Sequence, residues 1–284
     1  MIDNINWYPG HMKKTRELIK DNLKLVDLVI EVLDARIPIS SRNPIIDELV
    51  GSKPRVIALN KTDIASDKET KRWREYFVNE GSTPVAINAQ NGSGVSNLLK
   101  LLERIENQLS EGKMRQKPLR MMIVGVPNVG KSSLINRLTG KKSAQIGNKP
   151  GVTKGKQWLK LKNGMELLDT PGILWPKFED NRVGIYLAFC GSIKDEILDL
   201  PTLALELIKV LRRDYPSLLL ERYKLDASCL DLEYEDVELL DEICRRRGYI
   251  LQGKRIDYDR AGKAILDDFR SGKIGRITLE IAGE

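Results

Sequence analysis

One octapeptide governs the interpretation of this sequence: Gly125-Val126-Pro127-Asn128-Val129-Gly130-Lys131-Ser132. It fits the pattern G-x-x-x-x-G-K-[ST] and stands between a predicted strand, residues 121–124, and a predicted helix, residues 132–138. The two glycines let backbone N–H groups curl around phosphate oxygens, and the helix that follows presents its positive end. A chance glycine-rich turn is the alternative, but the complete pattern in this strand–helix context predicts a phosphate-binding loop.

The side chains of this loop have separate predicted roles. Lys131 can reach the β- and γ-phosphates of a nucleotide, and the Ser132 hydroxyl can ligate Mg²⁺. Val129, Gly130 and Ser133 complete the predicted contacts of this loop with the nucleotide.

A second motif, Asn60-Lys61-Thr62-Asp63, follows the predicted strand 55–59. In this N-K-x-D pattern the Asp63 carboxylate can accept hydrogen bonds from the N1–H and 2-amino groups of guanine, which adenine does not offer. The stem of Lys61 can cover the base, and Asn88-Ala89 stands where a second base-contacting loop belongs. N-K-x-D alone also describes an exposed turn. Together with the phosphate loop, it predicts a GTP-binding protein.

Two further segments fit the nucleotide-sensing switches of a GTPase. Asp169-Thr170-Pro171-Gly172 puts a carboxylate near the expected Mg²⁺ and the Gly172 N–H near the γ-phosphate. Thr153 offers a hydroxyl to Mg²⁺ from a loop that lies between the phosphate loop and Asp169. D-x-x-G alone describes many turns, but behind a phosphate loop it predicts a switch.

The order of these motifs is circularly permuted. Ordinary GTPases carry the phosphate loop first and N-K-x-D near the end, whereas here N-K-x-D comes first. A sheet domain whose original termini lie close together tolerates such a rearrangement. In this order the chain passes from the second switch directly into its last third, so movement of residues 169–172 is expected to pull on residues 177–284.

The apolar periodicity predicts two domains. Strands are expected at residues 28–33, 55–59, 84–87, 121–124, 156–161 and 165–168, and helices at 13–24, 69–80, 94–108 and 132–138. This alternation predicts a mostly parallel sheet covered on both faces. Further on, helices dominate, at about 182–190, 201–214, 234–247 and 258–271. We therefore expect an α/β P-loop GTPase domain over 1–176 and a smaller helical, RNA-binding domain over 177–284.

Composition and charge indicate the kind of partner and the cellular compartment. The 284 residues include 47 Lys+Arg against 40 Asp+Glu, a net charge of +7, which fits an anionic partner such as nucleic acid and fits a merely solvated surface about equally well. The sequence shows no signal peptide and no apolar run long enough to cross a bilayer. The three cysteines lack C-x-x-C spacing and are expected to be reduced. These features predict a soluble, cytoplasmic protein with no membrane partner, and we expect a monomer.

Three longer strings carry a family resemblance: Trp7-Tyr8-Pro9-Gly10-His11-Met12, Asp34-Ala35-Arg36-Ile37-Pro38-Ile39-Ser40-Ser41-Arg42-Asn43-Pro44 and Leu168-Asp169-Thr170-Pro171-Gly172-Ile173-Leu174-Trp175-Pro176. With the permuted motif order, they resemble the circularly permuted GTPases of bacterial ribosome biogenesis, over essentially the full length. The resemblance implies a GTPase that binds a late precursor of the large ribosomal subunit and its rRNA. Hydrolysis of GTP would be stimulated by that precursor and followed by release.

The resemblance also suggests how hydrolysis is activated. Small signalling GTPases place a water-orienting Gln directly after D-x-x-G, but this chain has Ile173 there. By resemblance, His11, the only histidine, lies at the position of the family's catalytic histidine, and a neutral imidazole can orient water. A structural His before the first helix is the alternative. By resemblance, Asn128 is a candidate K⁺ ligand, or it merely braces the turn.

Basic clusters are candidate RNA contacts. They are Lys13-Lys14-x-Arg16, the stretch from Lys113 to Arg120, Lys141-Lys142 with Lys149, Lys154 and Lys156, and Arg245-Arg246-Arg247 with Lys254-Arg255. Each alone also fits a solvated face. Residues 245–247 are the preferred contact because they belong to the extra domain, although there they also suit a helix C-terminus. A nucleotide-gated RNA-binding module and a protein-directed switch without RNA are the rival functions.

Overall fold

The computed structural model describes residues 12–110, 117–140, 158–168, 180–231 and 234–283. They form two compact units. One unit consists of Gly184–Ile277, and the other consists of the described residues of Asn6–Val183 together with those of Thr278–Glu284. The sequence-based division at 176/177 differs from this arrangement in two respects. The change of unit comes later in the chain, and the segment after Ile277 returns to the sheet-containing unit.

A six-stranded sheet with the order β3-β2-β1-β4-β6-β5 forms the centre of the larger unit. Its strands are β1 (Leu28–Asp34), β2 (Arg55–Asn60), β3 (Thr83–Ala86), β4 (Arg120–Val124), β5 (Trp158–Lys160) and β6 (Glu166–Leu168). All neighbouring strands pair in parallel except β5 and β6, which are antiparallel. The predicted mostly parallel sheet is therefore confirmed, with one antiparallel strand at its edge.

The strand order defines where a ligand binds. From β1 the chain moves outward through β2 to β3, and it then crosses back to place β4 on the other side of β1. The order of strands therefore reverses between β1 and β4. In open α/β sheets, ligands bind outside the carboxyl ends of the strands at such a reversal. The loop after β4 is the predicted phosphate loop, and the loop after the neighbouring β1 begins the Asp34-Ala35-Arg36 string.

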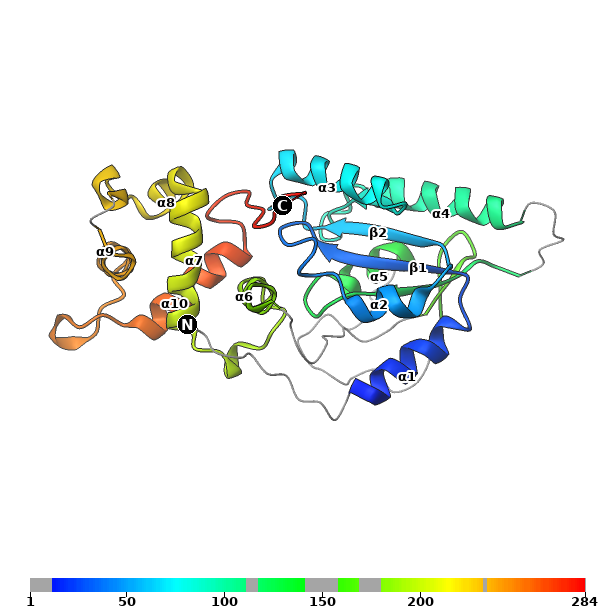
Figure 1. Cartoon of the computed structure of the whole chain (residues 1–284), viewed down its shortest axis with the longest axis horizontal. Helices are drawn as coiled ribbons and strands as arrows, with labels where there is room; N and C mark the ends of the chain where they lie inside the picture. Colours follow the sequence, from blue (N-terminus) through cyan, green and yellow to red (C-terminus); the bar gives the residue numbers. More distant parts are fainter. Residues whose placement is uncertain (1–11, 111–116, 141–157, 169–179, 232–233, 284) are drawn as a thin grey trace. The chain divides into compact units, whose positions relative to one another are not determined.

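Among the described residues, five helices lie wholly within the unit that contains the sheet (Figure 1): α1 (Met12–Leu23), α2 (Pro44–Val50), α3 (Asp67–Asn79), α4 (Val95–Ser110) and α5 (Lys131–Thr139). The apolar periodicity does not predict α2, because seven residues that start at a proline are too few to show a helical repeat. The side chain of Asn43 caps α2 by accepting a hydrogen bond from the N–H of Ile45.

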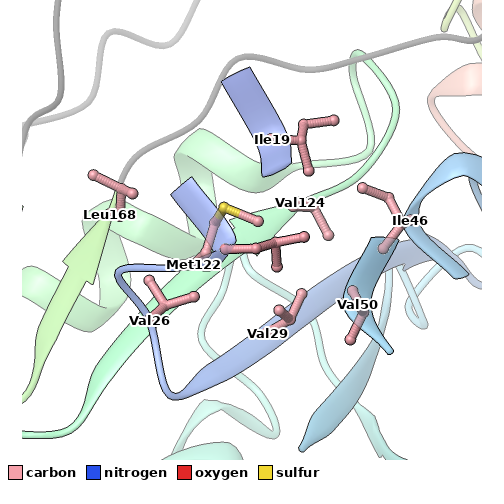
Figure 2. Close-up of a cluster of buried hydrophobic side chains, with 9 residues drawn as sticks. Ile19, Val26, Val29, Ile46, Val50, Met122, Val124 and Leu168 are labelled. Carbon is pink, nitrogen blue, oxygen red and sulfur yellow. The ribbon is translucent and has the colours of Figure 1, made fainter. Parts of the chain in front are cut away.

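Helices α1 and α2 pack against the sheet through one apolar cluster (Figure 2). It joins Ile19 and Leu23 of α1 and Ile46 and Val50 of α2 to residues from β1, β4 and β6. A second cluster joins α3 to β1 and β2 and includes Trp73 and Phe77. Each fully buried aliphatic or aromatic side chain contributes about 1.5–3 kcal/mol relative to leaving it exposed. These clusters hold β1 and β2 in place, and the base-reading loop follows β2.

The smaller unit is helical, as predicted. The helices of this part of the chain are α6 (Asn181–Phe189), α7 (Leu200–Asp214), α8 (Pro216–Tyr223), α9 (Asp236–Arg247) and α10 (Tyr258–Arg270). The first residues of α6 still belong to the larger unit. Helices α7 and α10 approach closely at Gly262, where an added Cβ would lie 2.8 Å from the carbonyl carbon of Leu200. Like α2, the short helix α8 starts at a proline and is not predicted by the apolar periodicity.

Two further observations concern the cysteines and the possible membrane spans. Cys190, Cys229 and Cys244 are free thiols and are buried. Among the helices that the structure describes, none is both long and apolar enough to span a membrane.

Candidate nucleotide-binding site

The phosphate loop, residues 125–132, connects β4 to α5 and depends on both of its glycines. Gly125 has φ 150° and Gly130 has φ 103°, conformations that side-chain-bearing residues rarely adopt. A Cβ at Gly125 would lie 2.5 Å from the carbonyl oxygen of Val32, and one at Gly130 would lie 2.2 Å from Nδ2 of Asn60. The glycines therefore allow the loop to press against β1 and against the base-reading loop.

Lys131 is buried at the start of α5. Its Nζ donates to the carbonyl oxygens of Gly125 and Val126, at 2.9 and 2.7 Å. The ammonium group therefore lies inside the curve of the loop, where a phosphate group would also be bound. Ser132 and Ser133, in the first turn of the same helix, are half-buried. Asn128 is exposed and adopts a left-handed φ of 58°.

The side chain of Asn60 joins three parts of the site. Its Nδ2 donates to the carbonyl oxygen of Val129 in the phosphate loop at 2.8 Å. Its Oδ1 accepts from the N–H of Ala89 in the second base loop, residues 88–91, at 2.9 Å. A carboxamide carries its donor and its acceptor on two separate atoms, so one short side chain can bond in two directions. Asn60 therefore fixes the base loop, residues 60–63, against both of its neighbours.

Lys61 is held by a buried ionic network. Its Nζ lies 2.9 Å from Oδ2 of Asp34, and the same oxygen lies 2.8 Å from a terminal guanidinium nitrogen of Arg36. Burial by itself raises the pKa of Asp34, but the two cations outweigh burial and hold that pKa well below its ordinary value. The Asp34-Ala35-Arg36 string, which carries the family resemblance, thus supports the base loop. The sequence offers no motif that assigns this role.

Thr62 of the base loop is held by the residue that follows β3, and Asp63 comes directly after Thr62. The Thr62 hydroxyl donates to the carbonyl oxygen of Ile87 at 3.0 Å. Asp63 follows directly and is exposed, and its carboxylate makes no hydrogen bond or ion pair with another described residue. The carboxylate predicted to read guanine is therefore accessible at the end of an anchored loop.

The second base loop is shaped by two side chains. Asn88 is buried, and its Oδ1 accepts from the N–H groups of Gln90 and Asn91, at 2.8 and 3.1 Å, so this side chain organises the turn. Arg137 of α5 donates to the carbonyl oxygens of Ala89 and Gln90. Sequence reasoning did not assign a role to Arg137, because nothing in the pattern of α5 distinguishes it from a solvated arginine.

Several predicted site residues lie outside the described residues. They are His11, Thr153, Asp169 and Gly172, together with Ile173 and the basic residues Lys113, Lys141, Lys142, Lys149, Lys154 and Lys156. The structure thus brings together the phosphate loop and both base loops, and it leaves the switches and the histidine as predictions.

A phosphate loop at the reversal point of a mostly parallel sheet, preceded in the chain by an N-K-x-D loop at the end of β2, defines a circularly permuted P-loop GTPase. Residues 120–221 match the family described as 50S ribosome-binding GTPase. Over 99% of its length, the chain is 46% identical to ribosome biogenesis GTPase A of Bacillus cereus and covers 95% of that protein. The chain belongs to the ribosome biogenesis GTPase A family.

Two further similarities extend along the chain. It is 34% identical to mouse mitochondrial ribosome-associated GTPase 1, over 98% of this chain and 90% of that protein. It is also similar to the crystal structure of GNP-bound YlqF from Thermotoga maritima, with a TM-score of 0.68 and 30% identity. That match covers 95% of this chain and 99% of the other. The similarity therefore includes the helical unit as well as the GTPase unit.

Replacing Lys131 tests the phosphate loop. We expect Lys131→Ala to weaken GTP binding by about 10- to 100-fold, because a charge-assisted contact with the phosphates is lost. Titration with GTP and single-turnover hydrolysis measure the effect. Lys68→Ala, which removes an exposed lysine on α3, is the matched control. Parental affinity and turnover in the Lys131 variant would contradict the assignment.

Proposed function

We propose that this protein binds and hydrolyses GTP to support late assembly of the large ribosomal subunit, acting on the precursor subunit and its rRNA in the cytoplasm as a monomer. The observation that carries the proposal is the match along almost the whole chain to ribosome biogenesis GTPase A, helical unit included. The bonds of Asn60 to the phosphate loop and the second base loop support a joined guanine-nucleotide site.

The proposed cofactor of hydrolysis is Mg²⁺, with the Ser132 and Thr153 hydroxyls as ligands and Asp169 in the surrounding shell. Ser132 fits this role: it is half-buried beside Lys131, and its hydroxyl makes no hydrogen bond with another described residue. Bound Mg²⁺ would neutralise charge that develops on the phosphates. Because Mg²⁺ at nucleotide sites is usually held by few protein ligands together with the phosphates, the phosphate oxygens would complete the coordination.

Two further groups are proposed to activate hydrolysis. His11 would orient the attacking water, since Ile173 at the usual glutamine position cannot hydrogen-bond. Asn128, exposed in the phosphate loop with a left-handed backbone, would offer its side-chain oxygen to K⁺. Gly172 would donate its N–H to the γ-phosphate, as the D-x-x-G pattern predicts.

The arginines proposed to contact rRNA differ in their surroundings. Arg246 pairs with Glu242 and Asp226, and Arg247 donates to the carbonyl oxygen of Arg222 and lies over the ring of Tyr223. The guanidinium groups of these two arginines are therefore engaged in contacts within the helical unit. Arg245 is more exposed, and the ion pairs that it forms with described residues are longer, at 3.5 and 3.6 Å, and involve acids of its own helix. Lys254 and Arg255 are exposed, and their side chains form no ion pair with another described residue.

Charge reversal tests the rRNA contact. We expect Lys254→Glu with Arg255→Glu to weaken binding to large-subunit precursors and to reduce its salt dependence, because fewer counterions are released from RNA phosphates. GTP affinity is expected to stay at the parental value. Lys68→Glu with Lys71→Glu, on exposed positions of α3, makes the same change in net charge and is the control. A complex that is indifferent to salt and to both variants would indicate a protein partner.

The function as a whole is tested by sedimentation and turnover. With a non-hydrolysable GTP analogue, the protein is expected to sediment with large-subunit precursors and to dissociate when GTP is supplied instead. Multiple-turnover hydrolysis is expected to rise when precursors are added. Binding without stimulated turnover would favour a nucleotide-gated RNA-binding module, and binding that survives removal of the RNA would favour a protein-directed switch.

A further inference from the structure

The segment after Ile277, residues 278–283, runs along the GTPase unit beside α3 (Figure 1). We call it the strap. Thr278 and Leu279 are buried, whereas Ile281 is exposed. Ala282 packs against the apolar cluster that joins α3 to β1 and β2. The strap therefore belongs to the core of the GTPase unit, although it follows the whole helical unit in the chain.

Glu280 anchors the strap to the loop that follows β1. One carboxylate oxygen, Oε2, accepts from the N–H of Ile39 at 2.6 Å. The other, Oε1, accepts from the N–H of Ser40 at 2.9 Å and also from the Ser40 hydroxyl. The backbone carbonyl oxygen of Glu280 accepts from Nε1 of Trp73 on α3 at 2.9 Å. Burial raises the pKa of Glu280 above its ordinary value, and the Ser40 bonds partly oppose this shift.

The first residues of the strap bind beside the ionic network that holds Lys61. The N–H of Leu279 donates to the carbonyl oxygen of Arg36 at 2.7 Å. The Thr278 hydroxyl oxygen lies 3.3 Å from the carbonyl oxygen of Ala35 and accepts from the N–H of Ser66 at 3.0 Å. The strap thus contacts Ala35 and Arg36, which directly follow β1, and Ser66, which lies just beyond the base loop in the chain.

The base loop is in turn bonded to these same residues. The N–H of Ala35 donates to the carbonyl oxygen of Asn60 at 2.9 Å. Asp34 pairs with both Arg36 and Lys61. A short series of bonds therefore leads from Glu280 through residues 34–40 to the base loop. None of these bonds involves the phosphate loop directly.

We propose that the strap positions the base loop for guanine-nucleotide binding, with Glu280 as the positioning residue. Bound nucleotide and the docked strap then stabilise each other, because coupling between two sites is reciprocal. The inference rests on the assignment of residues 60–63 as the loop that reads guanine. It extends that assignment to a segment with no recognisable nucleotide motif.

Glu280→Gln is the first test. The glutamine keeps the shape of the side chain but replaces one carboxylate oxygen by an NH₂ group. One of the two backbone N–H groups that donate to Glu280 in the parent then faces a donor instead of an acceptor. We expect the affinities for GDP and GTP to fall by about 5- to 20-fold, within the usual range of coupling between linked sites. The preference for guanine over xanthine nucleotides should not change, because Asp63 is intact. Ile281→Ser, at the exposed neighbouring position, is the control and should bind GDP as the parent does.

Amide exchange supplies a readout that a merely structural role would not change. In the parent protein, added GDP is expected to slow hydrogen exchange at the N–H of Leu279, which is bonded to Arg36. In Glu280→Gln the same N–H should exchange faster, and GDP should protect it less. Ser40→Ala removes one hydroxyl donor to Glu280 and should show the same changes on a smaller scale if Glu280→Gln does not fold.

Two results would overturn the inference. One is parental GDP affinity in Glu280→Gln although exchange at Leu279 has increased. The other is an exchange rate at Leu279 that does not respond to GDP in the parent protein. The assignment of the base loop fails separately, if Asp63→Asn leaves the preference for guanine unchanged. The two failures are therefore distinguishable in one set of binding measurements.

Discussion

Asp63→Asn is expected to change the ratio of GTP affinity to xanthosine triphosphate affinity by on the order of 10⁴-fold, in favour of the xanthine nucleotide. The substitution replaces a carboxylate, which only accepts hydrogen bonds, by a carboxamide that presents both a donor and an acceptor. Xanthine carries an oxygen where guanine carries its 2-amino group, so it matches the carboxamide. Because Lys61 and Thr62 are anchored by Asp34 and Ile87, the exchanged side chain keeps its place at the end of the loop.

Competition binding with the two nucleotides measures this change. Asp67→Asn, at the exposed first position of α3, makes the same chemical substitution a few residues away and is the matched control. Its preference should equal that of the parent. An unchanged preference for GTP in the Asp63 variant would show that this carboxylate does not read the base.

His11→Ala is expected to lower precursor-stimulated kcat by roughly 10²–10⁴-fold, the range for a positioned acid–base or water-orienting group. GTP affinity is expected to remain near the parental value, since the proposed role of His11 concerns water rather than the nucleotide. The variant should also stay on the precursor longer, because it is held in its GTP state. Turnover with saturating precursors and the dissociation rate from them are the two measurements.

A second substitution sharpens the test of His11. A glutamine orients the attacking water in small signalling GTPases, so His11→Gln is expected to recover part of the lost turnover. Thermal unfolding of both variants, with and without GDP, reveals any structural role. Stimulated turnover in His11→Ala equal to that of the parent would return the activation of hydrolysis to K⁺ or to the ribosomal precursor.

The loops that meet at the site could be predicted because each motif is a short, continuous stretch of the sequence. The glycines at 125 and 130 satisfy backbone conformations that few other residues adopt, and the apolar runs before each loop are long enough to show as strands. The sheet, its mostly parallel pairing and the helical second unit all follow from this pattern. The shortest helices, α2 and α8, do not, because they contain too few residues to show a period.

The partners of individual side chains could not be predicted in the same way. Arg246 and Arg247 look like an RNA-binding cluster in the sequence, but their guanidinium groups contact residues 20 to 25 positions away. Arg137 holds the second base loop from 47 positions away. Such contacts depend on how distant segments pack, which neither composition nor spacing records. The same holds for the strap, whose anchor Glu280 is separated from Ile39 by 241 positions.

The position of the strap in the chain has a consequence for biosynthesis. Residues 278–283 are translated after every other described residue, so the nascent chain can form β1 to β6 before its α3 surface is covered. Docking of the strap closes a loop that contains the whole helical unit, and the entropic cost of closing a loop grows only slowly with its length. Maturation of the guanine site is therefore expected to wait until residues 278–283 have been translated and have docked. Nascent chains stalled before residues 278–283 have emerged should release GDP faster than the finished protein, which a dissociation assay on the stalled complexes can measure.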